Sequence, residues 1–512
     1  MLELGGIRLI GTLRGGLRPR CALAPAAALA LAGCASYHAL PLPKTPNLTS
    51  RVPPLTIDAA SLRLPGIKPH PFNAADGLDA TEVAELAVVN NPDLRAERAK
   101  IGVARAQLFE AGLLPDPDLG MDYEKTTTSS SPALGQLRNA GSVSLSESLT
   151  DIITRGARQA AQKAALQQVD LGVVWSEWQV AQQARQLVVR LRAQQQQYAI
   201  VEQARRLEAQ RYAHTEQALA AHNLTLADAG PDLAALLDAE TQAGTLEQDL
   251  NRTRHSLNVL LGLNPDMKLK LAGPLPDQAL PTEAAYRQAL AHLAQRRPDL
   301  LALKAGYESQ NQTLREAILA QFPSLSVGLS RSVDNTGVFS TGLSITLSLP
   351  FLNGNRGQIA IARATRAQLH ADYQARLDAA YGSLDELWQE IHLLHAQAGA
   401  LKAHLPALRK LTARARKAYS AGNLDALTYF TLQTTAISKE SEAIGLEENL
   451  AEAWIALETL LGRPLPNAGQ SSKTSSDSSP LVPSGERVGV RGNSSAPPCG
   501  ATPHPNLVVR NA

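Results

Sequence analysis

One short segment of the chain alternates strictly between apolar and polar residues. This segment is Thr341–Pro350, TGLSITLSLP. Its apolar members are Leu343, Ile345, Leu347 and Leu349, and its polar members are Ser344, Thr346 and Ser348. Side chains on a β-strand point alternately to opposite faces, so a period of two predicts a strand with one apolar and one polar face. Most of the surrounding sequence has helical patterning.

The chain contains the same pattern twice. The set Leu246, Leu250, Leu257, Leu260, Leu261, Gly262 recurs as Leu446, Leu450, Leu457, Leu460, Leu461, Gly462. Asn91-Pro92-Asp93-Leu94 recurs as Arg297-Pro298-Asp299-Leu300, and the alternating segment has a counterpart in Gly141–Thr150, GSVSLSESLT. We therefore predict an internal duplication, with repeats at residues 80–263 and 285–463.

Each repeat is predicted to contain the same elements in the same order. A helix comes first, then two strands, then a very long helix, and finally a helix with leucines at spacings of four and seven. In the first repeat the ranges are Leu94–Leu114, Asp118–Lys125, Ser142–Leu149, 155–223 and Leu233–Leu261. In the second they are Leu300–Gln321, Ser324–Val333, Thr341–Leu349, 356–423, which Pro406 interrupts, and Leu427–Leu461. The fold class is thus mainly α with four strands.

The four strands have the pattern of membrane strands. A strand of about nine residues spans a bilayer when it is tilted, and aromatic residues near strand ends, such as Tyr123 and Phe339, are typical of such strands. A single-chain bacterial barrel needs at least about eight strands, and open edges are not tolerated in lipid. Four strands per chain therefore predict a barrel shared by several copies. The alternative is a soluble sheet that packs its apolar face on the helices, and Glu147 on that face argues against a perfect span.

The ends of the chain carry other signals. The 512 residues have a net charge of +2, which does not point to nucleic acid. Residues 1–33 have the arginines and short apolar run of a signal peptide, ending in Leu-Ala-Gly before Cys34. This junction is similar to a bacterial lipobox, so we expect Cys34 to be acylated, with ordinary signal cleavage nearby as the alternative. Residues 34–79 read as an extended lead from the lipid anchor, and residues 466–512 as a disordered tail.

Little in the sequence points to chemistry at a site. The three cysteines offer no disulfide framework. Glu390–His395 brings carboxylate and imidazole groups together on a helix, which permits a metal site, although a solvated or tunnel-lining face is the simpler interpretation. There is no CxxC, HExxH or Gly-rich phosphate loop. We expect no enzyme activity, no cofactor and no resident metal.

The doubled order of these motifs resembles the TolC-like outer membrane efflux proteins, especially the lipid-anchored CusC and CzcC type. The residues that carry the resemblance are the two Pro-Asp-Leu starts, the stretch Ala106–Leu119, the two Leu-Leu-Gly ends, and Tyr419–Gly422. The resemblance implies a homotrimer with a 12-stranded β-barrel among outer-membrane lipids and long helical hairpins that form an α-barrel across the periplasm.

The resemblance also implies partners and a role. The expected function is the passive exit duct of a tripartite efflux pump for metal ions or drugs. A periplasmic adaptor (membrane fusion) protein and an inner-membrane transporter of the RND type would complete it. The alternatives are the outer duct of a type I protein-secretion system and a non-channel periplasmic coiled-coil lipoprotein. No nucleic acid is expected among the partners.

The periplasmic entrance is predicted at the turns between the long helices. The candidate residues are Asn223, Leu224, Tyr419, Gly422, Asn423 and Asp425. In the resembling channels, acidic residues beyond the second turn surround the entrance, whereas this chain has Thr428 and Thr431 at the matching positions. Asp425 is the nearest carboxylate. It would attract cations if three copies met near one axis, or it would simply begin the last helix.

Overall fold

The computed structural model describes residues 37–53, 77–125, 138–272, 280 and 282–463. The chain divides into two units, Met1–Leu48 and Thr49–Ala512. In the first unit the described residues, 37–48, are exposed and form no helix or strand. The predicted signal peptide, Cys34 and the predicted tail lie outside the described residues.

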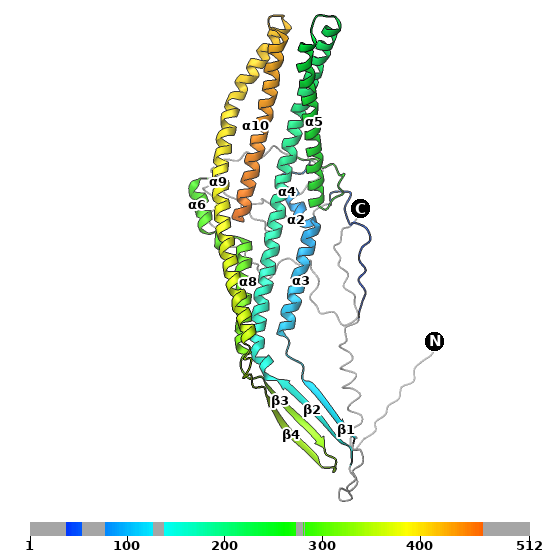
Figure 1. The fold of residues 1–512 in the computed structure, drawn as a ribbon, viewed down its shortest axis with the longest axis vertical. Coiled ribbons are helices and arrows are strands. Elements are labelled where there is room, and N and C mark those ends of the chain that lie inside the picture. The colour runs from blue at the N-terminus through cyan, green and yellow to red at the C-terminus, as the bar shows by residue number, and fades with distance from the viewer. Residues whose placement is uncertain (1–36, 54–76, 126–137, 273–279, 281, 464–512) are drawn as a thin grey trace, which may run out of the picture. The chain divides into compact units, whose positions relative to one another are not determined.

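The two halves of the second unit follow the same order of elements, except that the second half has one additional short helix (Figure 1). The first half contains α2 (Ala80–Asn90), α3 (Pro92–Gly112), β1 (Asp118–Glu124), β2 (Ala140–Ser148), α4 (Leu149–Ala220) and α5 (Leu226–Leu260). The second contains α6 (Glu283–Ala291), α7 (Leu293–Arg296), α8 (Pro298–Leu319), β3 (Leu325–Val333), β4 (Phe339–Leu347), α9 (Arg356–Ser420) and α10 (Ala426–Leu461). The predicted fold class, mainly α with four strands, is confirmed.

The helix boundaries correct several predictions. Helices α3 and α8 begin two residues earlier than expected, at Pro92 and Pro298, because proline fits the first helical turn, where its missing N–H is not needed. Helix α4 begins at Leu149, directly after β2, rather than at residue 155. Its first turn is capped by the Ser148 side chain, which accepts the Asp151 N–H at 3.4 Å.

Two helices continue through prolines, and only Pro406 was expected to interrupt its helix. Helix α9 is unbroken at Pro406, and α5 begins at Leu226, so that Pro231 lies inside it. A proline removes one backbone hydrogen bond, but residues on both sides of Pro406, such as Leu405 and Ala415, are buried. Packing of the flanking turns therefore holds the helix together across the proline.

The four strands form one antiparallel sheet in the order β1-β2-β3-β4. The β2–β3 pair joins the two halves of the chain, with Leu145 opposite Leu329. Strands β1 and β4 are the two edges, and in the described part of the chain neither has a second strand beside it. The sheet therefore has two open edges at one end of the helices (Figure 1).

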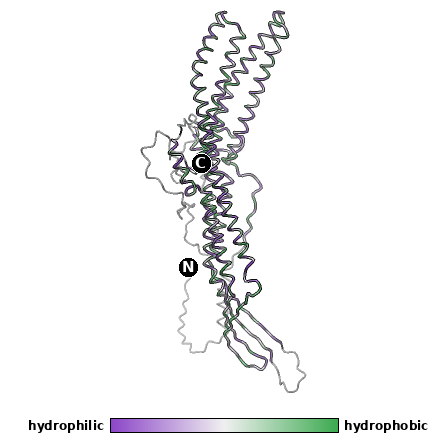
Figure 2. The backbone as a smooth tube through the Cα atoms, turned by 60° about the vertical axis from the view of Figure 1, so that its left-hand side comes forward, coloured by the Kyte–Doolittle hydropathy of each residue, from purple (hydrophilic) through white to green (hydrophobic). Residues whose placement is uncertain are grey.

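The helices pack around several apolar clusters, and the two largest lie one in each half. The first is formed by α2, α4 and α5, with Leu86, Val188 and Leu257 at its centre. The second is formed by α6 to α10 and includes Leu300 and Leu457. Helix α4, at 72 residues about 108 Å long, packs against α2, α3, α5, α8 and α10. Figure 2 shows hydrophobic and hydrophilic residues interleaved along these long helices.

The Leu-Leu-Gly repeats are helix ends that contact the helix starts of the same half. Gly262 and Gly462 follow α5 and α10 with φ of +63° and +68°, the left-handed conformation that favours glycine. A Cβ at Gly262 would also lie 2.8 Å from the Asn90 carbonyl oxygen. Asn91 donates to the Leu260 carbonyl at 2.9 Å, and Arg297 donates to the Leu460 carbonyl at 3.2 Å. The same contact between a helix end and a helix start therefore occurs once in each half, and the duplicated motifs mark its two sides.

Candidate functional site

The sheet has two chemically different faces. The strand register aligns Leu119, Leu145, Leu329 and Leu343 in one row across all four strands. The opposite face consists mostly of serine and glycine, with rows such as Gly120, Ser144, Ser330 and Gly342. The four leucines of the apolar row are exposed, Leu343 at 70%. The described helices thus leave the apolar face uncovered, unlike the soluble alternative.

Two charged residues interrupt the apolar face. Glu147, noted from the sequence, aligns with Val327 and Ile345. The sequence analysis missed Arg331, which pairs with Val143 on one side and Thr341 on the other. The Arg331 guanidinium lies 5.8 Å from the centre of the Phe339 ring, toward the loop end of the strand. The uncharged part of the apolar face is therefore shorter along the strands than the alternation of apolar and polar residues indicates.

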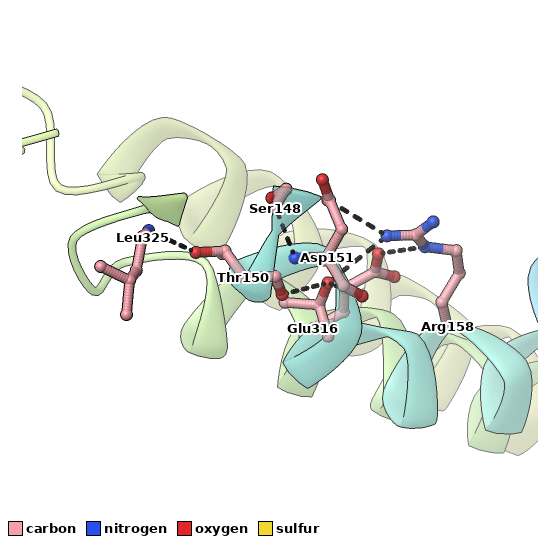
Figure 3. Close-up of polar contacts among 7 residues, drawn as sticks. Ser148, Thr150, Asp151, Arg158, Glu316 and Leu325 are labelled. Atoms are coloured by element: carbon pink, nitrogen blue, oxygen red, sulfur yellow. Dashed lines mark hydrogen bonds and ion pairs between the residues drawn. The ribbon is translucent and has the colours of Figure 1, made fainter. Parts of the chain in front are cut away.

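The junction between the sheet and the helices is held by polar contacts from both halves of the chain (Figure 3). Thr150, in the first turn of α4, accepts the backbone N–H of Leu325 at 2.9 Å, which ties the start of β3 to α4. Arg158 of α4 pairs with Glu316 of α8 at 3.1 Å and with Asp151 at 3.7 Å. The β2–β3 pairing thus continues into the α4–α8 contact.

Each half also fixes the end of the helix that precedes its strands. Arg155 donates to the Gly112 carbonyl at the end of α3, with its Nε at 2.9 Å. Asn355 donates to the Ala317 carbonyl near the end of α8 at 2.8 Å. Cationic or amide donors suit the unpaired carbonyls at a helix C-terminus. Different residues therefore do the same task in the two repeats.

The predicted entrance residues lie at the two turns between long helices. Asn223 donates its N–H to the Ala218 carbonyl at 2.9 Å, and Asn423 donates to Ala418 at 2.8 Å, so the two turns have the same geometry. Leu224 is partly exposed, whereas Tyr419 stacks on Tyr429 with ring centres 4.7 Å apart. These residues are placed where the sequence analysis put them, but their role in an entrance stays a prediction.

Asp425 is the N-cap of α10. Its Oδ1 accepts the Thr428 N–H at 2.8 Å. This backbone hydrogen bond is the main reason that the pKa of Asp425 is lowered, so the carboxylate is charged at neutral pH. Asp425 therefore caps the start of α10, and a role in an entrance would depend on the negative charge of its carboxylate.

The first turn uses a strained residue where the second uses glycine. His222 has a φ of +57°, and the matching residue Gly422 has +73°. Replacing His222 by glycine is expected to stabilise the protein by about 0.5–1 kcal/mol, because the left-handed conformation costs a side-chain-bearing residue more than glycine loses in unfolded-state freedom. The measurement is the thermal unfolding midpoint. Ala221→Gly, at a φ of −82°, should lower it instead, and a drop for His222→Gly would contradict the argument.

A buried polar network joins the two helical hairpins near these turns. Arg211 of α4 pairs with Asp232 of α5 and with Glu208 at 3.5 Å. Its guanidinium lies 5.9 Å from the centre of the Phe430 ring of α10, and Thr434 of α10 donates to Glu208 at 2.9 Å. The network therefore connects α4, α5 and α10. The sequence analysis missed it because its members are far apart in the chain.

The two halves also meet along a seam between α4 and α10. Arg185 pairs with Glu458 at 2.7 Å, and Arg190 pairs with Glu452 through both of its oxygens, at 2.9 and 2.7 Å. Glu448 lies 3.8 Å from Arg190, so three carboxylates face two arginines. Glu448 therefore shares Arg190 with Glu452 and has no arginine of its own. This composition makes the seam sensitive to protonation.

Burial, together with the nearby Glu452 charge, raises the pKa of Glu448 to about 7, and Arg190 offsets part of the rise. Because the unfolded chain loses this proton near pH 4.5, the folded state holds the extra proton and its stability falls as the pH rises from there to about 7. The expected result is a steeper loss of the unfolding midpoint between about pH 5 and pH 8 in wild type than in Glu448→Gln.

The control for this pH dependence is Glu447→Gln. Glu447 adjoins Glu448 in sequence but is about half exposed, with 44% of its side chain accessible, and it pairs with Lys402 of α9 at 3.4 Å. Its removal should leave the wild-type slope unchanged. Equal slopes for Glu448→Gln and wild type would show that Glu448 is ionised throughout this range.

The predicted metal alternative gains no further support. His392 contacts its own helix, with Nδ1 2.7 Å from the Trp388 carbonyl oxygen, and its ring centre lies 4.4 Å from the Trp388 ring centre. The carbonyl contact requires Nδ1 to carry the proton, so the ring donates there. Within the described residues, no group of three His, Cys, Asp or Glu could hold a metal ion. The described helices include none that is both long and apolar enough to cross a membrane.

Residues 285–463 match the model of the family described as outer membrane efflux protein. This match covers the second predicted repeat and about a third of the chain. The relative OprJ, an outer membrane protein of Pseudomonas aeruginosa, is 24% identical over 233 residues. This match covers 40% of the chain and 47% of OprJ, so it spans about half the length of that relative.

Solved structures of outer membrane channels share the fold over a larger part of the chain than the OprJ match covers. CusC, described in the context of transmembrane channel formation, superposes with a TM-score of 0.62 at 18% identity, covering 83% of this chain and 99% of CusC. The CmeC outer membrane channel of Campylobacter jejuni gives 0.62 at 15% identity, covering 76% and 86%. These identities establish a common fold. The outer membrane efflux proteins and their structural neighbours are named as membrane proteins and channels, not as enzymes.

Proposed function

We propose that this protein is the outer membrane channel of a tripartite efflux pump, a passive exit duct for small toxic solutes such as metal ions or drugs. The observation that carries the proposal is the four-stranded sheet with an exposed leucine row, a serine and glycine face, and two open edges. In lipid the edges must be paired, and four strands are too few to close a barrel. Several copies that share one barrel satisfy both conditions.

Three copies give the twelve-stranded barrel that the resemblance implies. The edge β1 of one copy would pair with the edge β4 of the next, with serine and glycine lining the passage. The long helices, about 108 Å in α4, would extend the passage through the periplasm. A periplasmic adaptor and an inner-membrane transporter of the RND type would complete the pump. Acylation of Cys34 would add a lipid anchor, which labelling with a palmitate analogue in wild type and Cys34→Ala tests.

The experiment that tests the channel is its reconstitution. The full-length protein is purified in mild detergent, its mass is measured, and it is added to planar bilayers. We expect a trimer and stable single-channel currents. A monomer that forms no pore would overturn the proposal in favour of a structural lipoprotein.

The entrance is proposed at the turns near Asn223, Leu224, Tyr419, Gly422 and Asn423, with Asp425 as its nearest charge. Replacing Asp425 by asparagine keeps an N-cap acceptor for Thr428 and removes the charge. If three such carboxylates line the passage, Asp425→Asn should lower the cation selectivity of the single-channel current across a salt gradient, and Asp425→Lys should lower it further. Unchanged selectivity in both assembled variants would leave Asp425 with its capping task alone.

A further inference from the structure

A groove lies between α9 and α10, close to the second turn (Figure 1). Its volume is about 800 Å³, which is within the range of small-molecule sites. The charged residues that line it are Arg409, Arg416 and Lys417 of α9 and Glu440 of α10. Arg409 and Arg416 are seven residues apart, about two helical turns, so they lie on the same side of α9. We call this cavity the α9–α10 groove.

Positive charge is in excess in the α9–α10 groove. Glu440 pairs with Arg409 at 2.6 Å and so neutralises one of the three cations. Within the described residues, Arg416 and Lys417 have no carboxylate close enough for an ion pair, and both are exposed. Their N–H donors are therefore available to a ligand. Charge-assisted hydrogen bonds to a carboxylate or phosphate are the strongest that such groups form.

The first repeat builds the equivalent hairpin without these cations. The two hairpins align at an offset of 200 residues, because α4 and α9 end at Ala220 and Ser420 and their turns share one geometry. At this offset the counterparts of Arg409, Arg416 and Lys417 are Ala209, Glu216 and Gln217. The shared fold therefore does not require the cations, which points to a task that only the second hairpin performs.

The space in the groove follows from the residues of α10. The first repeat has Leu233 and Leu236 where the second has Gln433 and Ala436, both of which line the groove. Alanine leaves room that a leucine would occupy. The Gln433 Oε1 atom is buried and accepts no hydrogen bond from the described residues. A buried acceptor without a donor costs free energy, which a ligand with a hydroxyl or amino group would recover.

We propose that the α9–α10 groove binds a small organic anion that carries two or more carboxylate or phosphate groups and one hydroxyl or amino donor. Arg416 and Lys417 bind the anionic groups, and Gln433 accepts the donor. This inference goes beyond the proposed channel, because the groove is formed by one hairpin and needs neither the barrel nor a pump. It is also separate from the predicted entrance charge, since Asp425 does not line the groove and has the opposite sign.

The test is calorimetric titration of citrate, a hydroxy-tricarboxylate, into the purified full-length protein in mild detergent. One double variant, Arg416→Gln with Lys417→Gln, removes the two unpaired cations of the groove. The matched control, Lys410→Gln with Arg414→Gln, removes two exposed cations of the same helix that do not line the groove. A third variant, Ala436→Leu, introduces the residue of the first repeat and fills the space without changing the charge.

We expect wild type and the Lys410 and Arg414 control to bind citrate with similar dissociation constants. The Arg416 and Lys417 variant should bind at least about tenfold more weakly, the effect of losing one hydrogen bond to a charged group. Ala436→Leu should also weaken binding. Tricarballylate, which lacks only the hydroxyl of citrate, should bind wild type more weakly, and equal affinity would overturn the assignment of Gln433.

The absence of citrate binding to wild type, or equal weakening in the two double variants, would overturn the proposal. Binding to dissociated monomers alone would also overturn it and assign the groove to the interface between copies. The planar-bilayer experiment separates this result from the channel proposal. A protein that conducts but binds no citrate keeps the channel and loses the anion site, whereas one that binds citrate without conducting keeps the site and loses the channel.

Discussion

Replacing Arg297 by alanine is expected to lower the free energy of unfolding by about 1.5–3 kcal/mol, the usual range for hydrogen bonds to a charged group, because Asp299 keeps Arg376 at 2.9 Å as a second cationic partner. Arg297 is 1% exposed. Its guanidinium binds both oxygens of Asp299 at 2.7 and 2.9 Å and lies 4.9 Å from the Trp175 ring centre. The variant would leave the Leu460 carbonyl without this donor. Denaturant unfolding of the purified protein measures the loss.

Two variants separate this role from a general effect of losing an arginine. Arg206 is an exposed arginine of α4 that pairs with Glu202, and Arg206→Ala should cost less than about 0.5 kcal/mol. Asn91 stands at the equivalent position of the first repeat, where it donates to the Leu260 carbonyl. Arg297→Asn should therefore lose less unfolding free energy than Arg297→Ala, because the asparagine side chain can donate to the Leu460 carbonyl. A loss below about 1 kcal/mol in Arg297→Ala would show that the pair contributes little.

Placing a lysine at Leu343 is expected to cost about 2–4 kcal/mol per copy if the apolar row lies near the middle of the bilayer. Leu343 is the central residue of β4, and its neighbour in the register is Leu329. The charge would lie in the leucine row, whose register partners are all apolar, so the variant should yield less assembled protein in the outer membrane. The measurement is the amount of heat-modifiable oligomer recovered from membranes.

The adjacent residue provides the matched control. Ser344 lies on the opposite face, beside Gly328 and Ser146, so the lysine of Ser344→Lys would enter the proposed water-filled passage. This variant should assemble like wild type and change conductance instead. If both variants lose the same amount of oligomer, the assignment of the two faces is incorrect.

The order of elements was predicted well from the sequence because the same order of motifs occurs in both repeats. The Pro-Asp-Leu starts and Leu-Leu-Gly ends mark positions where a helix start contacts a helix end, and such local signals recur together. The strand faces followed from a period of two, which needs only a few residues to read. Boundaries were less accurate, since Ser148 can end a strand or cap a helix, and only the fold decides.

The contacts between distant segments could not be read in the same way. Arg211 has no motif around it, and its partners Asp232 and Phe430 lie in two other helices. Arg331 was visible in the sequence, but its position within the apolar face depends on the strand register.

The connection between sheet and helices differs in stiffness from one half to the other. Strand β2 passes into α4 with no residue between them, whereas residues 348–355 separate β4 from α9 and include left-handed Gly354 and Asn355. A torque on α4 is transmitted straight to its strand, while a torque on α9 reaches a loop first. In the proposed three-copy ring, α4–α5 hairpins that are directly continuous with a strand would alternate with α9–α10 hairpins that are joined to theirs by a loop. The α9–α10 hairpins would then move relative to the barrel without deforming it.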